Sequence, residues 1–283
     1  MPLISNTHGK GRVRTLRIAK HPDGTQSVRE LNCHVMLEGD FGRSFSAADN
    51  SRTLSTDTMK NLINIVAKEH PDTPNEPFLQ AVCRRFLERY ETIGTVSITA
   101  HETRWTRMVV NGAPAAHAFT LDGNGRPVAK VTATRAGMDT ESGVAGLTFL
   151  KSTASGWANF WQDSYTTIPP TDDRIAATAL DARWTWTGAP ADYEAANATI
   201  LQTMLGVFAE TYSHSMQDSL YRMAEAALAK VTEIGQVSLA APNKHYLLVN
   251  LAPFGLTNEN EVFLPTDEPH GQIECVVGRA APP

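Results

Sequence analysis

The sequence predicts an α+β protein in which one arrangement occurs twice: two strands, two helices and two more strands. The order of strand-like and helix-like patterns in residues 1–136 recurs in residues 137–283. A chain of 283 residues, of which 42% are hydrophobic, is long enough to fill two modest cores. Each half should form a four-stranded antiparallel sheet with helices on one face. The opposite face would need cover, which burial against another copy of the chain can provide.

The first half begins with a predicted hairpin. Residues 10–20 and 28–38 mix apolar and polar positions on either side of the turn Pro22-Asp23-Gly24. Two helices follow: the hydroxyl of Thr56 would cap the first, and Pro77 would open the second. Their apolar positions recur at helical spacing: Met59, Leu62, Ile63, Val66, Phe78, Val82, Phe86 and Tyr90.

Two strands, 92–103 and 127–135, should complete the first sheet, with an excursion containing Gly and Asn between them. The second half repeats the plan. Its expected elements are strands at 143–152 and 178–187, helices at 191–210 and 215–230, and strands at 234–241 and 244–251.

Composition excludes several classes of partner. The formal net charge is −5 and no block of Lys or Arg is present, so we expect neither nucleic acid nor an anionic membrane as partner. No apolar run approaches the length of a membrane span. The start lacks a secretory leader and the carboxyl end is not Ser-Lys-Leu, so we expect a bacterial cytoplasmic protein rather than a peroxisomal one.

The sequence predicts no metal site. Cys33, Cys83 and Cys275 are far apart and form no Cys-x-x-Cys pair, so reduced thiols are expected. The nine histidines show no zinc-binding spacing, although distant ligands could still converge.

Asn243 and His245 form the most informative local pattern. On a strand these two side chains share a face, while Lys244 points the opposite way. An amide and an imidazole side by side can hold a small polar molecule. Isolated Asn and His residues in strands are more often simply solvated or bonded to backbone, and the pattern alone leaves that alternative open.

Further segments extend the pattern over nearly the whole chain and in a fixed order. They are His8-Gly9-Lys10-Gly11, Ser55-Thr56-Asp57-Thr58, Asp172-Asp173-Arg174-Ile175, Ser215-Met216-Gln217 and Pro242-Asn243-Lys244-His245, with residues 49–51, 146–147, 151–153, 163–167, 260–263 and 271–274. Together they resemble the cofactor-independent urate oxidases (uricases). The resemblance implies two T-fold (tunnelling-fold) domains, 1–136 and 137–283, closed into barrels between the subunits of a homotetramer.

The resemblance places Lys10, Thr56 and His245 in the proton-relay triad of the family. These residue types suit the task, because a lysine shielded from water and near an imidazole can act as a base through a hydroxyl. From the residues alone, an ordinary strand-end cation at Lys10 and a simple helix cap at Thr56 are the favoured interpretations.

Arg174 and Gln217 correspond to the pair that grips the edge of the planar purine. A guanidinium presents parallel donors and a carboxamide presents a donor beside an acceptor. Without the resemblance, Arg174 could form an ion pair with Asp172 or Asp173, and Gln217 could be a solvated residue in the first turn of a helix.

Asn243 corresponds to the family's ligand for dioxygen or water, acting with Thr56, and the backbone amides of Asp57 and Met216 would add hydrogen bonds. By the same resemblance, the residues of the two halves meet across a subunit interface. A monomer should therefore be inactive.

The sequence departs from the family pattern at Trp157, where uricases usually carry the phenylalanine that stacks on the substrate. Indole keeps a stacking face but is larger and adds an N–H donor. His8 also replaces the tyrosine common before Gly-Lys, which could perturb the surroundings of Lys10.

The expected activity is oxidation of urate by dioxygen, with water, to 5-hydroxyisourate and hydrogen peroxide in purine degradation, with neither metal nor flavin. The alternatives are an oxidase of a modified purine, suggested by Trp157, and a non-catalytic urate-binding protein. A T-fold enzyme acting on pterins is less consistent with the sequence, because no Cys/His zinc site can be assembled.

Overall fold

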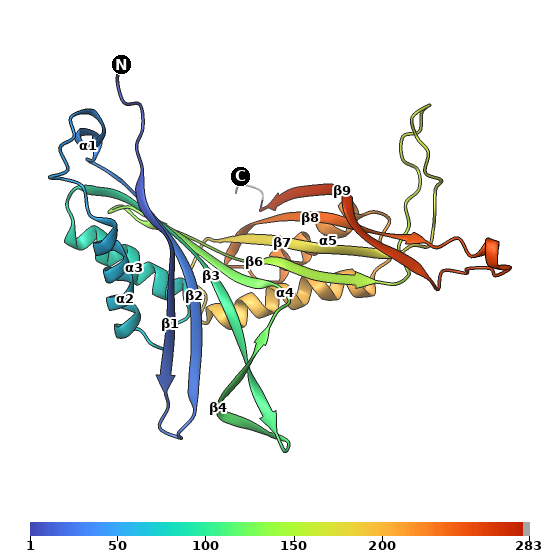
Figure 1. Ribbon diagram of the computed structural model, residues 1–283, viewed down its shortest axis with the longest axis horizontal. Helices are drawn as coiled ribbons and strands as arrows, with labels where there is room; N and C mark the ends of the chain where they lie inside the picture. Colours follow the sequence, from blue (N-terminus) through green and yellow to red (C-terminus); the bar gives the residue numbers. More distant parts are fainter. Residues whose placement is uncertain (280–283) are drawn as a thin grey trace. The chain divides into compact units, whose positions relative to one another are not determined.

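The computed structural model describes residues 1–279, and the C-terminal residues 280–283, which bear on the expected localisation, lie outside them. The chain separates into two compact units, Met1–Gly143 and Val144–Pro283. Each unit consists of an antiparallel sheet and a pair of long helices, labelled in Figure 1. The predicted α+β class is confirmed.

The first unit contains four strands in the order β1-β2-β3-β5, with β4 paired to the far end of β3. Its elements are β1 (His8–Lys20), β2 (Gln26–Gly39), α1 (Gly42–Ser46), α2 (Thr56–Glu69), α3 (Asn75–Arg89), β3 (Ile93–Val110), β4 (Ala113–Asp122) and β5 (Arg126–Ala133). The predicted hairpin, both helices and both later strands are present. The additional strand β4 was not predicted.

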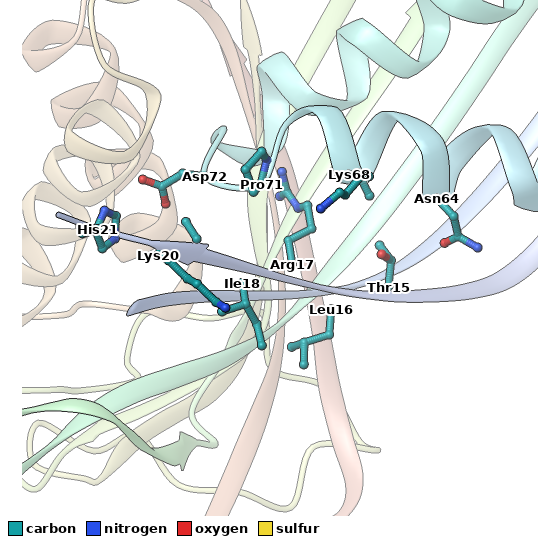
Figure 2. Close-up of a pocket in the computed structure, with 12 residues that line it drawn as sticks. Thr15, Leu16, Arg17, Ile18, Lys20, His21, Asn64, Lys68, Pro71 and Asp72 are labelled. Carbon is teal, nitrogen blue, oxygen red and sulfur yellow. The ribbon is translucent and has the colours of Figure 1, made fainter. Parts of the chain in front are cut away.

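The core of the first unit forms because strand and helix periodicities match. Alternate residues of β2, including Leu31 and Val35, face the helices, and one side of α2 and one side of α3 pack on them. On β1 the alternation leaves Leu16 and Ile18 exposed on the opposite face. Figure 2 shows Arg17 of the same strand pointing toward α2 while Leu16 and Ile18 point away.

The second unit has the strand order β6-β7-β8-β9. Its elements are β6 (Met138–Lys151), which begins before the unit boundary, β7 (Ala176–Trp186), α4 (Tyr193–Glu210), α5 (Met216–Lys230), β8 (Ile234–Leu248), a short 3₁₀ helix η1 (Ala252–Phe254) and β9 (Phe263–Gly278). The predicted strands at 234–241 and 244–251 are wrong: they are one strand, β8, and the last strand is β9.

Proline placement explains two of the errors. Pro242 lies inside β8, between Ala240, which pairs with Asp181, and Asn243, which pairs with Thr178 in the same register, so the interruption is local. Pro77 is the third residue of α3 and not its first. A proline is tolerated there because first-turn amides have no partner within the helix.

Within residues 1–279, no helix combines the length and the apolar character that a membrane crossing requires.

Candidate active site

Lys10, Thr56 and Asp57 all belong to the first unit. Lys10 lies on β1, and Thr56 and Asp57 are the first two residues of α2. The helix is capped by Ser55, whose hydroxyl accepts a hydrogen bond from the backbone amide of Thr58 at 3.2 Å. The prediction that Thr56 caps α2 is therefore wrong, because the residue before it does so. The Thr56 hydroxyl is left for another role.

The start of β1 is tied to the segment ahead of α2. The imidazole Nε2 of His8 donates to Leu54 O at 2.8 Å, which brings the beginning of β1 to the residues that lead into the helix. Gly9 is required here, because a Cβ at this position would lie 2.1 Å from Val35 O on β2. The position before Lys10 on β1 therefore accepts only glycine, because β2 lies too close for a side chain.

Electrostatics also connect Lys10 with the first turn of α2. The pKa of Asp57 is lowered, chiefly by the hydrogen bond from Lys60 Nζ at 2.7 Å, with a smaller contribution from the charge of Lys10. Lys10 therefore lies within electrostatic reach of the helix start, as the predicted pairing of Lys10 with Thr56 requires.

In the second unit, three segments are held together by backbone hydrogen bonds. The amide of Gly156 donates to Ser213 O at 2.9 Å, and the amide of Trp157 donates to Thr171 O at 2.7 Å. A side chain at position 156 would force its neighbours to move, because a Cβ would lie 2.4 Å from the Tyr212 hydroxyl and 2.9 Å from Thr171 O. These hydrogen bonds join the segments around residues 156–157, 171 and 213 into one framework, here called the frame, which fixes the backbone position of Trp157.

Arg174 is attached to the same frame. Its Nε donates to Gly156 O at 3.1 Å, and its guanidinium carbon lies 6.0 Å from the centre of the Trp157 ring. Burial lowers the pKa of Arg174 by desolvating the charge. The alternative ion pair with Asp172 or Asp173 does not occur in the described part of the chain, so the fork of Nη1 and Nη2 remains for a ligand.

Trp157 has a neighbour that sequence reasoning missed. The indole stacks on the ring of Phe160, with centroids 5.3 Å apart and planes 8° from parallel. Asn159, between them, adopts a left-handed backbone conformation with φ 58°, which turns the chain back on itself. Asn tolerates this conformation better than most residues, but the stacking that results is not readable from the sequence.

The first turn of α5 presents the next pair of predicted residues. Met216 is almost fully buried in the core, whereas the side chain of Gln217 is exposed. Ser215 caps the helix by accepting from the amide of Asp218 at 3.1 Å. The amides of Met216 and Gln217 have no acceptor within the helix and lie at its positive end, which suits an electron-rich ligand.

Asn243 and His245 both lie on β8. Leu239 and Ala241 are buried against the helices, and the same alternation continues to Asn243. The pairing of β8 with β9 is irregular between Asn243 and His245. Lys244 lies on the other face, where its Nζ binds Asp267 at 2.9 Å. Met216 and Ala241 belong to the same buried cluster, in which α5 packs on β8.

The predicted site residues thus form two groups, one in each unit. The first unit brings together Lys10, Thr56 and Asp57. The second unit contains Trp157, Arg174, Met216, Gln217, Asn243 and His245, of which Trp157 and Arg174 lie within 6.0 Å of each other, measured from the guanidinium carbon to the ring centre. Across residues 1–279, no three His, Cys, Asp or Glu side chains converge as a metal ion would require.

One large hollow lies in the first unit. It has a volume of about 710 Å³ and lies between β1 and the C-terminal part of α2, with Arg17, Lys20, Lys68 and Asp72 among its lining residues (Figure 2). It contains none of the predicted site residues. Consecutive β1 residues line it, because β1 is the edge of its sheet.

These features define a class of protein. Two α+β units, each with an antiparallel sheet and a helix pair, form a tandem T-fold protein. Its second unit contains the aromatic ring of Trp157, the guanidinium of Arg174 and the N-terminus of α5, three features that suit a planar, electron-rich ligand. The chain matches the Uricase family model over residues 6–132 and 140–274, and it belongs to that family.

The similarity to known uricases extends over almost the full length of this chain and of each relative. The chain is 38% identical to the uricase of Aspergillus flavus, with 97% of this chain and 96% of that protein covered. It is 34% identical to the uricase of Dictyostelium discoideum, with 98% of each covered. The crystal structure of uricase from Arthrobacter globiformis superimposes with a TM-score of 0.94 at 33% identity, covering 100% of this chain and 96% of that one.

Proposed function

We propose that this protein is a urate oxidase, which converts urate, dioxygen and water to 5-hydroxyisourate and hydrogen peroxide. The observation that carries the proposal is the pair of Trp157 and Arg174 on one hydrogen-bonded frame, in a chain of the uricase family. Urate is flat and anionic, so it needs a ring to stack on and a cation at its edge.

In this proposal the second unit holds the substrate. Urate stacks on the face of Trp157 that Phe160 does not cover. The Nη atoms of Arg174 and the carboxamide of Gln217 bind neighbouring carbonyl and ring-nitrogen atoms at the purine edge. The amides of Met216 and Asp57 add donors from the first turns of two helices. These contacts orient urate in the site and stabilise its negative charge before the reaction begins.

Lys10, Thr56 and His245 move protons. Deprotonated urate gives two electrons to dioxygen, which takes two protons and leaves as hydrogen peroxide, while water supplies the hydroxyl group of the product. The relay accepts the urate proton through the Thr56 hydroxyl and returns protons to the reduced oxygen. The cap formed by Ser55 supports this role, because the Thr56 hydroxyl is not needed to start the helix.

Asn243, with Thr56, binds dioxygen or water. An amide N–H is a donor suited to an oxygen species that gains negative charge as it accepts electrons.

We further propose a homotetramer with active sites at subunit interfaces. β1 is an edge strand that lines the hollow shown in Figure 2, and Leu16 and Ile18 are exposed on the face of β1 away from the helices. A free edge and an apolar sheet face both favour cover by another chain. The same copies would bring the Lys10 group of one chain to the Arg174 group of another.

A single experiment tests the activity. Protein treated with a chelator is mixed with urate in air, and the near-ultraviolet absorbance of urate is followed together with hydrogen peroxide formation. Equal loss of urate and gain of peroxide is expected. Binding of urate without turnover would instead show a binding protein, and turnover of 8-substituted or methylated purines alone would show an oxidase of a modified purine.

A further inference from the structure

Two buried oxygen atoms on β7 and β8 have no hydrogen-bond partner, and they belong to residues that face each other. Thr178 pairs with Asn243 in the antiparallel ladder. Thr178 is 0% exposed, and neither its Oγ1 nor the Oδ1 of Asn243 has a partner among residues 1–279. A buried polar group left unpaired destabilises the folded state, because it has lost its hydrogen bonds to water without gaining any from the protein. Two such groups at one point on the sheet therefore indicate a missing interaction.

The two side chains lie on the same face of the sheet. On β7 the alternating residues Leu180 and Ala182 are buried under the helices, and Thr178 continues that series. On β8 Asn243 continues the series of Ala241. Directly opposed residues on one face have Cβ atoms about 4.5–5.5 Å apart, within reach of a hydroxyl-to-amide hydrogen bond after a change of side-chain rotamer.

The chemistry of the two groups decides the direction of that bond. The carboxamide oxygen of Asn243 can only accept, whereas the hydroxyl of Thr178 can donate. The buried atom of the carboxamide is Oδ1, and the nitrogen of the same group is not among the buried unpaired atoms of the described chain. A bond from Thr178 to Oδ1 satisfies both orphaned oxygens and leaves Nδ2 free.

We infer that Thr178 is a positioning residue that donates to Oδ1 of Asn243 and so holds Nδ2 toward the bound oxygen species. This inference rests on the proposed function, in which Asn243 binds dioxygen or water. Its consequence is electrostatic. Reduced dioxygen is an anion, so Nδ2 as donor stabilises it, whereas a carboxamide turned by 180° would present Oδ1 and repel it.

The test compares Thr178→Val, which keeps the shape and removes the hydroxyl, with Thr178→Ser, which keeps the hydroxyl. Thr185→Val, on the same strand, is the matched control. Loss of one such hydrogen bond corresponds to about a fivefold to tenfold change. We expect Thr178→Val to lower kcat/KM for dioxygen by that factor with KM for urate unchanged, while Thr178→Ser and Thr185→Val retain parental values.

A double-mutant cycle with Asn243→Ala separates positioning from a general packing effect. If Thr178 acts through Asn243, Thr178→Val has no further effect in the Asn243→Ala background. The same fold-loss in both backgrounds, or parental kinetics for Thr178→Val, would overturn the inference while urate oxidation stands. If Thr178→Val does not fold, judged by thermal unfolding, Thr178→Ala takes its place in the cycle. A parental protein that does not oxidise urate removes the proposed function and this inference with it.

Discussion

The indole of Trp157 lies parallel to the ring of Phe160, with planes 8° apart and centroids separated by 5.3 Å. One face of the indole is therefore occupied, and the other is the face on which a purine would stack. Phe160 is three residues away from Trp157 and would act on a bound purine only through the indole. The stacking surface is thus a two-ring unit held by a single turn of backbone.

Phe160→Leu should weaken urate binding. The variant keeps an apolar side chain but removes a ring pair that contributes about 0.5–1.5 kcal/mol. We expect KM for urate to rise by roughly twofold to tenfold while kcat changes less. Steady-state kinetics at saturating dioxygen measure this, with Phe160→Tyr as the control that keeps the ring. An unchanged KM in Phe160→Leu would show that the stack does not support the substrate.

Replacement of Trp157 itself separates ring size from ring presence. Trp157→Phe should retain urate oxidation with equal or higher turnover, because a smaller ring relieves displacement of the substrate against Arg174 and Gln217. Trp157→Ala should lose affinity, because the stacking face is gone. Kinetics on urate and on methylated purines decide between these effects. Loss of all activity in Trp157→Phe would contradict the prediction.

Ser55 and Thr56 should have separable roles. Ser55→Ala removes the cap of α2 and should lower the free energy of unfolding by about 0.5–2 kcal/mol. Thr56→Val leaves the cap in place, so it should unfold as the parent does while turnover falls by roughly 10²- to 10⁴-fold. Denaturant unfolding and single-turnover rates measure the two quantities. A Thr56→Val protein with parental turnover would exclude the hydroxyl from the relay.

Substitutions in the purine-binding residues should change the affinity for urate, whereas substitutions in the proton relay should change the rate of the chemical step. Arg174→Ala and Gln217→Ala should chiefly raise the dissociation constant of urate, because each removes contacts at the purine edge. Lys10→Met should chiefly slow the chemical step, by roughly 10²- to 10⁴-fold, with binding retained. Equilibrium binding under anaerobic conditions and single-turnover kinetics in air distinguish the two. Parental turnover by Lys10→Met would make the relay assignment wrong.

The buried thiols predict a loss of stability at alkaline pH. Burial raises the pKa of Cys33 and of Cys83 to about 12, from an ordinary value of 9.0. Between these values the unfolded chain loses thiol protons that the folded chain keeps, so the free energy of unfolding falls as pH rises above about 9. Chemical unfolding from pH 8 to 11 should show this fall, and Cys33→Val with Cys83→Val should reduce it. An identical slope in that double variant would exclude the thiols as its cause.

Much of the fold could be predicted because its information is local. The turn at Pro22-Asp23-Gly24 and the helical spacing in α2 predicted their elements correctly. The hairpin of β3 and β4 was missed although Asn111 and Gly112, both with positive φ, are a typical two-residue hairpin turn. That signal was in the sequence, whereas the course of β8 through Pro242 depends on its neighbours in the sheet.

The predicted site residues came from a family pattern, and the structure adds what a pattern cannot contain. The alternation that places Asn243 on the face of Ala241 follows from strand geometry and was predictable. The position of Thr178 opposite Asn243 depends on the register of two strands far apart in the sequence. The stack of Phe160 on Trp157 depends on the left-handed residue Asn159. Neither spacing nor composition specifies such contacts.

Gly156 limits the routes by which this site can evolve. Every missense change in a glycine codon adds at least a Cβ, and here that atom would collide with Thr171 O and with the hydroxyl of Tyr212. The hydrogen bonds of the neighbouring Trp157 to Thr171 use only its backbone amide and carbonyl, which any residue except proline also has. Substitutions that change substrate preference are therefore expected at position 157 and at its stacking partner Phe160. Gly156 should be retained in every relative that keeps the hydrogen bonds between residues 156–157, 171 and 213.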